Sequence, residues 1–195
     1  MVMRAVLPSC APVEVEMINS MRKVLVMAAL AAAVPVAVSA QHEHRSVAQT
    51  EAWKTLKTLV GQWQGTVVEN GKEQVSQVKV RMTGGGSALM HVMAEGTPYE
   101  MVTMFHPDLD ELLATHYCAA HNQPRMKLMS STPTRLVFEF KDGSNIGPND
   151  GHMVGLVIDF LDPDHHDEAW SYLDGGKRST TVFHYTRSST AAKAP

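Results

Sequence analysis

The chain has 195 residues, of which 44% are hydrophobic and 19% are charged, and its formal net charge at neutral pH is −3. This balance argues against nucleic-acid binding through a basic surface, because such binding depends on neutralising many phosphates. The length suits one domain with a sizeable core once a leader has been removed.

The first forty residues have the order of an export leader. A short basic start at Met21-Arg22-Lys23 is followed by an apolar run over residues 24–38 and by small residues that end at Ala40. This order is typical of a signal peptide over 21–40. The apolar run is shorter than the ~20 residues that a membrane-spanning helix needs. We therefore predict a secreted or periplasmic protein with no membrane span after cleavage. We expect residues 1–20 to be an over-called start or a variable extension, with Met1, Met17 and Met21 as the alternative start codons.

Cleavage after Ala40 leaves a mildly acidic chain with a single cysteine. The leader holds three of the 17 basic and two of the 20 acidic residues, so 14 basic and 18 acidic residues remain, for a net charge of −4. Cys10 is lost with the leader, and Cys118 then has no partner for an intramolecular disulfide. A lone thiol in an oxidising compartment is buried, reactive or intermolecular, and burial is the commonest state of cysteine.

The mature chain starts with a polar, flexible tail at 41–46, and an amphipathic helix is predicted after it. The helix is expected because apolar side chains fall on one stripe: Trp53, Leu56, Leu59 and Val60. Gly61 is expected to end the helix. After it the spacing changes to the alternation of β-strands.

Ten short strands with turn residues between them are predicted to follow the helix. Their ranges are 62–69, 74–82, 88–95, 99–106, 112–118, 124–130, 135–140, 152–160, 169–173 and 180–187. One helix in front of about ten strands favours an all-β fold, a single antiparallel up-and-down β-barrel with the helix closing one end. We expect this domain to span 47–187 and a disordered tail to occupy 188–195.

The segment Gly61-Gln62-Trp63, where a helix runs into Gly-x-Trp at the first strand, resembles the calycin superfamily of lipocalins, fatty-acid-binding proteins and haem-binding nitrobindins. There the tryptophan packs across the barrel floor, so the resemblance implies structural roles for Gly61 and Trp63. Segments 101–106, 115–126 and 162–170 resemble an uncharacterised group of secreted bacterial proteins, a domain of unknown function near the nitrobindins. The resemblance implies a lipocalin-like fold and no particular activity.

Residues 115–126 collect polar side chains around a strand end and the turn after it. Strand alternation places His116 and Cys118 on one face. Arg125 follows a proline, and its five donors suit a carboxylate or phosphate. Arg125 can equally pair with an acid at the barrel rim, with the amides holding the loop. The candidate contacts for the polar end of a ligand are His116, Cys118, Asn122, Gln123 and Arg125.

Eight methionines lie on or beside the predicted strands. Flexible thioethers fill gaps in a core, and they also line cavities that accept apolar ligands of several shapes. A ten-stranded barrel is wide enough to leave interior space. We therefore predict binding of a small, mainly apolar molecule with a polar or anionic end, whose apolar part contacts Met90, Met101 and Met104. The protein is expected to be a monomer or a dimer.

Two alternative functions stay open. In nitrobindin-like proteins the haem ligand lies near the C-terminal end of the barrel, where His184 falls, so the resemblance implies haem as an alternative cofactor. His116 and Cys118 can also form a nucleophilic pair, with Asn122 as an oxyanion donor, in an enzyme of unknown reaction. Residues 162–168 collect acids and imidazoles but read as a solvated turn, so no metal site is predicted.

Overall fold

One helix and ten strands follow one another in the computed structural model, which describes residues 47–69 and 71–188. The elements are α1 Val47–Lys57, β1 Gly61–Glu69, β2 Lys72–Thr83, the 3₁₀ turn η1 Gly84–Gly86, β3 Ala88–Met93, β4 Met101–Asp108, β5 Glu111–Tyr117, β6 Gln123–Thr132, β7 Arg135–Ser144, β8 His152–Asp162, β9 His165–Asp174 and β10 Lys177–Arg187. The predicted leader, the tail at 41–46 and residues 189–195 of the predicted C-terminal tail lie outside the described residues.

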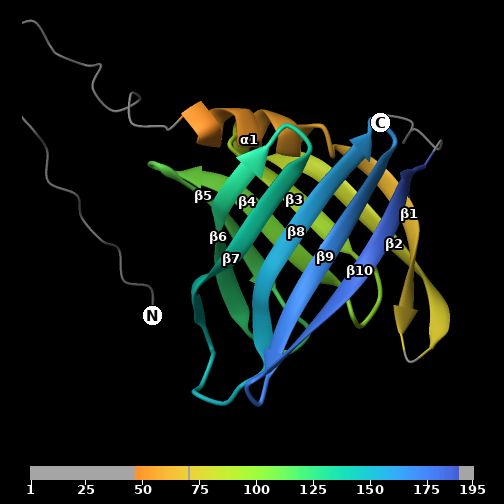
Figure 1. Ribbon diagram of the computed structural model, residues 1–195, viewed down its shortest axis with the longest axis vertical. Helices are drawn as coiled ribbons and strands as arrows, with labels where there is room; N and C mark the ends of the chain where they lie inside the picture. Colours follow the sequence, from red (N-terminus) through yellow and green to blue (C-terminus); the bar gives the residue numbers. More distant parts are fainter. Residues whose placement is uncertain (1–46, 70, 189–195) are drawn as a thin grey trace, which may run out of the picture. The chain divides into compact units, whose positions relative to one another are not determined.

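The strands form one closed antiparallel barrel, as the alternation and turn residues predict (Figure 1). Each strand pairs with the next along the chain, and β1 pairs with β10 to close the wall. Two-residue turns permit this up-and-down path. Between β9 and β10, for example, Gly175 and Gly176 have φ of 53° and 77°, values that side chains disfavour and that such hairpin turns require.

The strands bury apolar side chains in the barrel interior. Completely or almost completely buried residues from several strands form its core: Leu89, Phe105, Ala114, Met126, Leu136, Phe138, Leu156 and Ile158. Ala52, Trp53 and Leu56 of α1 join the same cluster. The helix therefore packs on one barrel end with Trp53 and Leu56 of its predicted stripe. It ends at Lys57 and not at Gly61, so Leu59 and Val60 lie after it, and Val60 is 41% exposed.

The connection from α1 into β1 is held by Trp63 and Arg187. The Trp63 ring is buried, and its Nε1 donates to the carbonyl of Leu59 at 2.7 Å. The Arg187 guanidinium lies 4.0 Å from the Trp63 ring centroid. It also donates to three backbone carbonyls at 2.9–3.1 Å, those of Thr58, Val60 and Pro163. The last strand thus fixes the first one beneath the helix.

Gly61 is needed at this junction for two reasons. Its φ of 145° is rarely adopted by residues with side chains, and an added Cβ would lie 2.6 Å from Nη1 of Arg187. The glycine therefore allows the arginine to reach the carbonyls that end the helix.

The barrel wall is incompletely paired along the β1–β2 hairpin. β2 pairs with β3 only over residues 78–83, and β1 pairs with β10 only over residues 63–66. One further backbone bond joins Ala94 N to Gln77 O at 3.2 Å. The far half of this hairpin consequently extends beyond its neighbouring strands (Figure 1).

Candidate functional site

Among the described residues, three histidines and one carboxylate are buried inside the barrel: His91 on β3, His116 on β5, and His166 and Glu168 on β9. None of them is more than 2% exposed. Oε1 of Glu168 accepts hydrogen bonds from Nε2 of His91 at 3.0 Å and from Nε2 of His166 at 3.2 Å. Its Oε2 accepts from Nε1 of Trp170 at 2.9 Å. We call His91, His116, His166 and Glu168 the interior cluster.

The bond between His91 and Glu168 crosses the barrel, because β3 and β9 are separated by β2, β1 and β10 in the sheet. Strand alternation on β9 turns His166, Glu168 and Trp170 inward and leaves Asp167 on the outer face. The prediction of a solvated turn over residues 162–168 is therefore wrong for its second half, since β9 already begins at His165.

The interior cluster places one carboxylate within hydrogen-bonding distance of two imidazole rings. Burial raises the pKa of Glu168, but the charges and hydrogen bonds of His91 and His166 outweigh this and hold the pKa well below its usual range. Glu168 is therefore ionised at neutral pH. His116 differs from Glu168 in its charge state. Burial, helped by the charge of His91, lowers the pKa of His116 to about 4. Its imidazole is neutral at neutral pH.

His116 keeps one hydrogen-bonding atom without a partner. Its Nδ1 lies 2.9 Å from Oγ1 of Thr103, and its ring centroid lies 5.1 Å from that of Trp170. Within residues 47–69 and 71–188, Nε2 of His116 makes no hydrogen bond, and the same holds for Nδ1 of His166 and Oδ1 of Asn122. Leaving such an atom unsatisfied costs about 1–3 kcal/mol, so a buried orphan atom marks a place that calls for an explanation.

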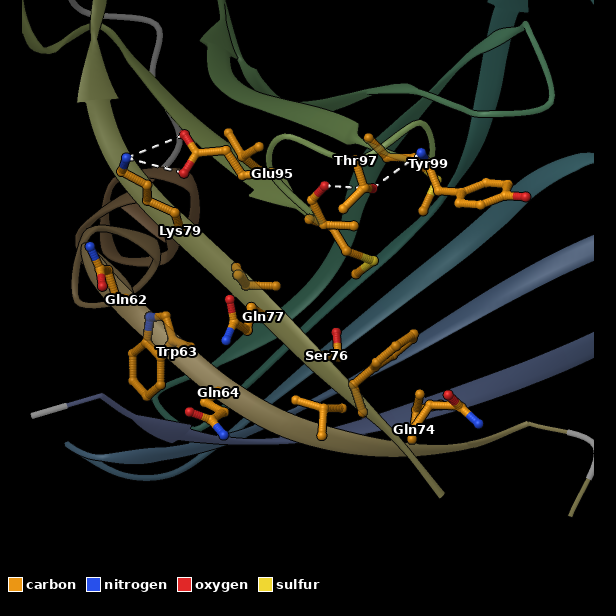
Figure 2. Close-up of a pocket in the computed structure, with 18 of the residues that line it drawn as sticks. Gln62, Trp63, Gln64, Gln74, Ser76, Gln77, Lys79, Glu95, Thr97 and Tyr99 are labelled. Carbon is orange, nitrogen blue, oxygen red and sulfur yellow. Dashed lines mark hydrogen bonds and ion pairs between the residues drawn. The ribbon is translucent and has the colours of Figure 1, made fainter. Parts of the chain in front are cut away.

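A hollow of about 830 Å³ runs along β1 and β2 and past the loop at 94–99 (Figure 2). Its inner wall is mainly apolar and consists of Trp63, Val67, Ser76, Val78, Met93, Met101 and Phe183. Ser76 and Val78 line it from the inner face of β2, and Gln77 and Lys79 line it from the outer face. The first half of β2 has no β3 partner, so the hollow reaches from the interior to the outer surface beside this strand.

The hollow and the interior cluster are neighbours. Oγ of Ser76, in the inner wall, lies 2.8 Å from the hydroxyl of Tyr185. The Tyr185 ring stacks on His166 with centroids 5.2 Å apart, and His166 bonds Glu168. Burial raises the pKa of Tyr185, and the negative charge of Glu168 raises it further. The Tyr185 hydroxyl therefore stays protonated next to the hollow.

The structure separates the predicted ligand-binding methionines. Met101 lines the hollow. Met90 and Met104 are cross-strand partners on the outer face, because their chain neighbours Leu89 and Phe105 point into the core. Met93, which was not among the predicted contacts, occupies the inner wall instead.

The predicted polar contacts in residues 115–126 are likewise divided. His116 is buried inside the barrel, but Arg125 lies on the outer face and forms a two-bond ion pair with Asp142, at 2.5 and 2.7 Å. This is the rim pairing that the sequence left open. Nδ2 of Asn122 donates to the carbonyl of Gly151 at 2.8 Å, and Gln123 accepts from Ser144 at 2.8 Å. Both amides thus hold loops.

The side chains behind the two alternative functions, Cys118 with His116 and His184, are bonded to other groups or lie at the surface in the described part of the chain. Cys118 is half-buried just after β5, and its backbone N donates to the carbonyl of Asn122 at 3.0 Å. His116 bonds Thr103, on the neighbouring strand. His184 lies on the outer face, where its Nδ1 is 2.8 Å from Oδ1 of Asp167. The placement of His184 gives no support to haem ligation inside the barrel.

Several residues of the site were not predicted: Ser76, His91, His166, Glu168 and Tyr185. The available signal was the alternation His166-x-Glu168-x-Trp170, which has the period of a strand but carries polar inward residues. Among the described residues, no group of three His, Cys, Asp or Glu has an arrangement that could hold a metal ion. No helix in that part of the chain is long and apolar enough to cross a membrane.

Comparison with known proteins adds to the fold only. No protein-family model and no curated protein matches the chain. Among solved structures, it is similar to a protein of unknown function of the DUF3598 family from Nostoc punctiforme, with a TM-score of 0.50 and 12% sequence identity. The similarity covers 68% of this chain and 48% of the other, so the chain spans about half the length of that protein. At this identity the likeness shows a shared fold.

Proposed function

We propose that this barrel is a lipocalin-like binding protein that holds a small, mainly apolar molecule with one polar end. The hollow beside β1 and β2 is the observation that supports this function. Its volume of about 830 Å³ falls in the range of roughly 300–1,000 Å³ that is usual for small-molecule sites. The chain's resemblance to calycins around Gly61-Gln62-Trp63 points the same way.

The inner wall suits the apolar part of such a ligand. Val67, Val78 and Phe183 supply branched and aromatic surface, and Met93 and Met101 supply flexible thioethers. Burial of each methylene group contributes about 0.8 kcal/mol, so a chain of about ten carbons contributes roughly 8 kcal/mol towards the cost of association. The methionines adapt to ligands of different shape, which favours a class of related molecules over a single one.

The polar end has a partner in the same wall. The Ser76 hydroxyl shares one hydrogen bond with Tyr185, which leaves it further capacity to donate or accept. We place the polar end of the ligand against Ser76. The sequence analysis predicted a different contact for the polar end, namely the polar residues of the 115–126 stretch.

The proposed place of action is the periplasm or the medium. The proposal depends on the leader at 21–40, which lies outside the described residues. The test is to express the full-length gene in a Gram-negative bacterium, to determine the N-terminal residue of the purified protein, and to find the cell fraction that contains it. We expect mature protein that begins at Gln41 in the periplasm or the medium, and a cytoplasmic chain that retains residues 21–40 would contradict the assignment.

Native mass spectrometry after gentle purification tests the binding function. The purified protein is mixed with a lipid extract of the expression host before the measurement. We expect the wild type to carry a small molecule from that extract. Val67→Trp should lose it, because Val67 is buried in the inner wall and a larger ring fills the hollow. Val68→Trp is the matched control, since Val68 is 70% exposed on the outer face of the same strand. Equal retention by both variants, or no bound molecule in the wild type, would contradict the proposal.

A further inference from the structure

The charges inside the barrel are distributed unevenly. In the described part of the chain, the buried polar side chains are Ser76, His91, Thr103, His116, Asn122, His166, Glu168 and Ser171. This set includes a carboxylate but no lysine or arginine. Nε2 of His91 and Nε2 of His166 are both hydrogen-bonded to Glu168, so neither atom is free to pair with a ligand carboxylate.

The cations closest to the interior are committed to other groups. Arg187 stacks on Trp63 and donates to backbone carbonyls. Lys79 is the one lysine or arginine among the described residues that line the hollow. It lies on the outer face of β2, where its Nζ is 3.2 Å from both carboxylate oxygens of Glu95 (Figure 2). Glu95 also lines the hollow, so the pair adds no net charge to the lining.

The remaining polar groups along the hollow are uncharged. They are hydroxyls and side-chain amides from the strands and the adjacent loop: Gln62, Gln64, Gln74, Ser76, Gln77, Thr97, Tyr99 and Ser188. Behind Ser76 stands Tyr185, which stacks on His166 and lies within reach of the field of Glu168. Hydroxyls and amides both donate and accept hydrogen bonds, so this lining satisfies a ligand hydroxyl or amide directly.

A ligand carboxylate would find different conditions in the same place. It needs a cation, most often the paired donors of an arginine, to replace its hydration. A charge that is taken out of water without such a partner is strongly unfavourable.

From this charge distribution we infer that the hollow selects amphiphiles with an uncharged polar end, a hydroxyl or an amide, and discriminates against carboxylates of the same chain length. The inference rests on the proposed binding function and narrows it to one class of ligand. It replaces the choice between a polar and an anionic end, which the sequence left open.

Isothermal titration calorimetry of the wild type with 1-decanol and with decanoate at pH 7 tests the inference. The two probes share the same alkyl chain and differ in the polar end. We expect 1-decanol to bind at least tenfold more tightly than decanoate. Decanoate binding as tightly as the alcohol, or more tightly, would overturn the inference and leave the binding function intact. No binding of either probe would count against the binding function itself.

A pair of substitutions on β4 tests the cause of the discrimination. Met101→Lys places a cation in the inner wall, whereas Met104→Lys places the same cation on the outer face of the same strand. We expect Met101→Lys to shift the affinity ratio towards decanoate by at least tenfold and Met104→Lys to leave it unchanged. Circular dichroism establishes that each variant is folded. An unchanged ratio in folded Met101→Lys would overturn the electrostatic explanation, and the wild-type comparison stands as a test if that variant does not fold.

Discussion

Two pairs of hydrogen-bonded titratable side chains in this barrel lie in different surroundings and have different consequences for stability. Arg125 and Asp142 pair on the outer face, with side chains that are 47% and 42% exposed. His91 and Glu168 pair in the interior, with side chains that are 2% and 1% exposed. Solvent screens the first pair and offers an alternative to each partner. The second pair has no such alternative, so its members depend on one another and on Trp170 and His166.

The comparison shows where polar side chains matter in a closed barrel. The sequence draws attention to residues 115–126, where many polar groups stand together, but Asn122, Gln123 and Arg125 bond to residues of the 142–151 segment at the rim. The interior cluster is assembled from β3, β5 and β9, and its members are far apart in the chain. Buried polar groups are therefore the ones that define the electrostatic character of the hollow beside them.

The largest effect is expected from Glu168→Ala. This change leaves His91, His166 and Trp170 with buried donors that have lost their acceptor. Breaking a buried pair in this way typically costs about 3–5 kcal/mol of the free energy of unfolding. Urea denaturation followed by circular dichroism measures the loss. A loss below about 1 kcal/mol, the range of an exposed pair, would remove the contrast between the two regions.

The second effect is a pH dependence that originates from His116. Its folded-state pKa of about 4 lies below the ordinary histidine value of 6.5, so the unfolded chain takes up a proton first as the pH falls. Stability from this group is therefore complete above pH 6.5 and is lost as the pH falls towards 4. The difference corresponds to roughly 3 kcal/mol.

Unfolding free energies between pH 7 and pH 4 check this effect. His116→Gln should flatten the profile in that window, and His184→Gln should not, because His184 is exposed on the outer face. The Glu168 pKa is also lowered, and its contribution is lost at lower pH, as the pH falls below 4.5. An unchanged slope in His116→Gln would show that His116 is not held neutral by burial.

A smaller effect is expected from Arg187→Ala at the closed end. The change removes the cation over Trp63 and the donors to the carbonyls of Thr58, Val60 and Pro163. We expect a loss of about 2 kcal/mol, measured as a lower thermal midpoint. Arg135→Ala serves as the control, since Arg135 pairs with Asp159 at the surface. Equal losses in the two variants would argue against a special role for the closed end.

The smallest effect is expected from Arg125→Ala. An exposed ion pair contributes between 0 and about 1 kcal/mol, so stability should change little. Affinity for 1-decanol should not change, because Arg125 points away from the interior. A tenfold loss of affinity would restore the prediction from sequence that Arg125 contacts the ligand.

Much of the fold follows from the sequence because the strands carry clear local signals. Val78 and Val80 alternate with charged residues on β2, and Gly175-Gly176 marks a tight turn. The inward face of β3 was harder to predict, because Leu89, Met90, Val92 and Met93 are apolar on both sides of the strand. Period-two spacing gives no preferred face in such a run, so it does not decide the face of Met90. On β4 the same spacing separates Met101 from Met104, which are three residues apart and therefore lie on opposite faces.

The interior cluster was beyond reach for a different reason. The start of β9 has polar residues facing inward, so it lacks the apolar alternation that identifies strands and reads as a turn. The bond between His91 and Glu168 also joins residues 77 positions apart, on strands that are not neighbours. Local pattern contains no information on such a contact. His116 was selected correctly as an inward residue, because Leu112 and Ala114 define its face of β5.

A crystal structure of the protein grown with 1-decanol tests the central claim most directly, namely that the barrel wall encloses space for a guest molecule. The account predicts electron density for the alkyl chain between Val78, Met93 and Met101, with the hydroxyl within hydrogen-bonding distance of Ser76. An interior in which side chains occupy this space, with no ligand density, would contradict it.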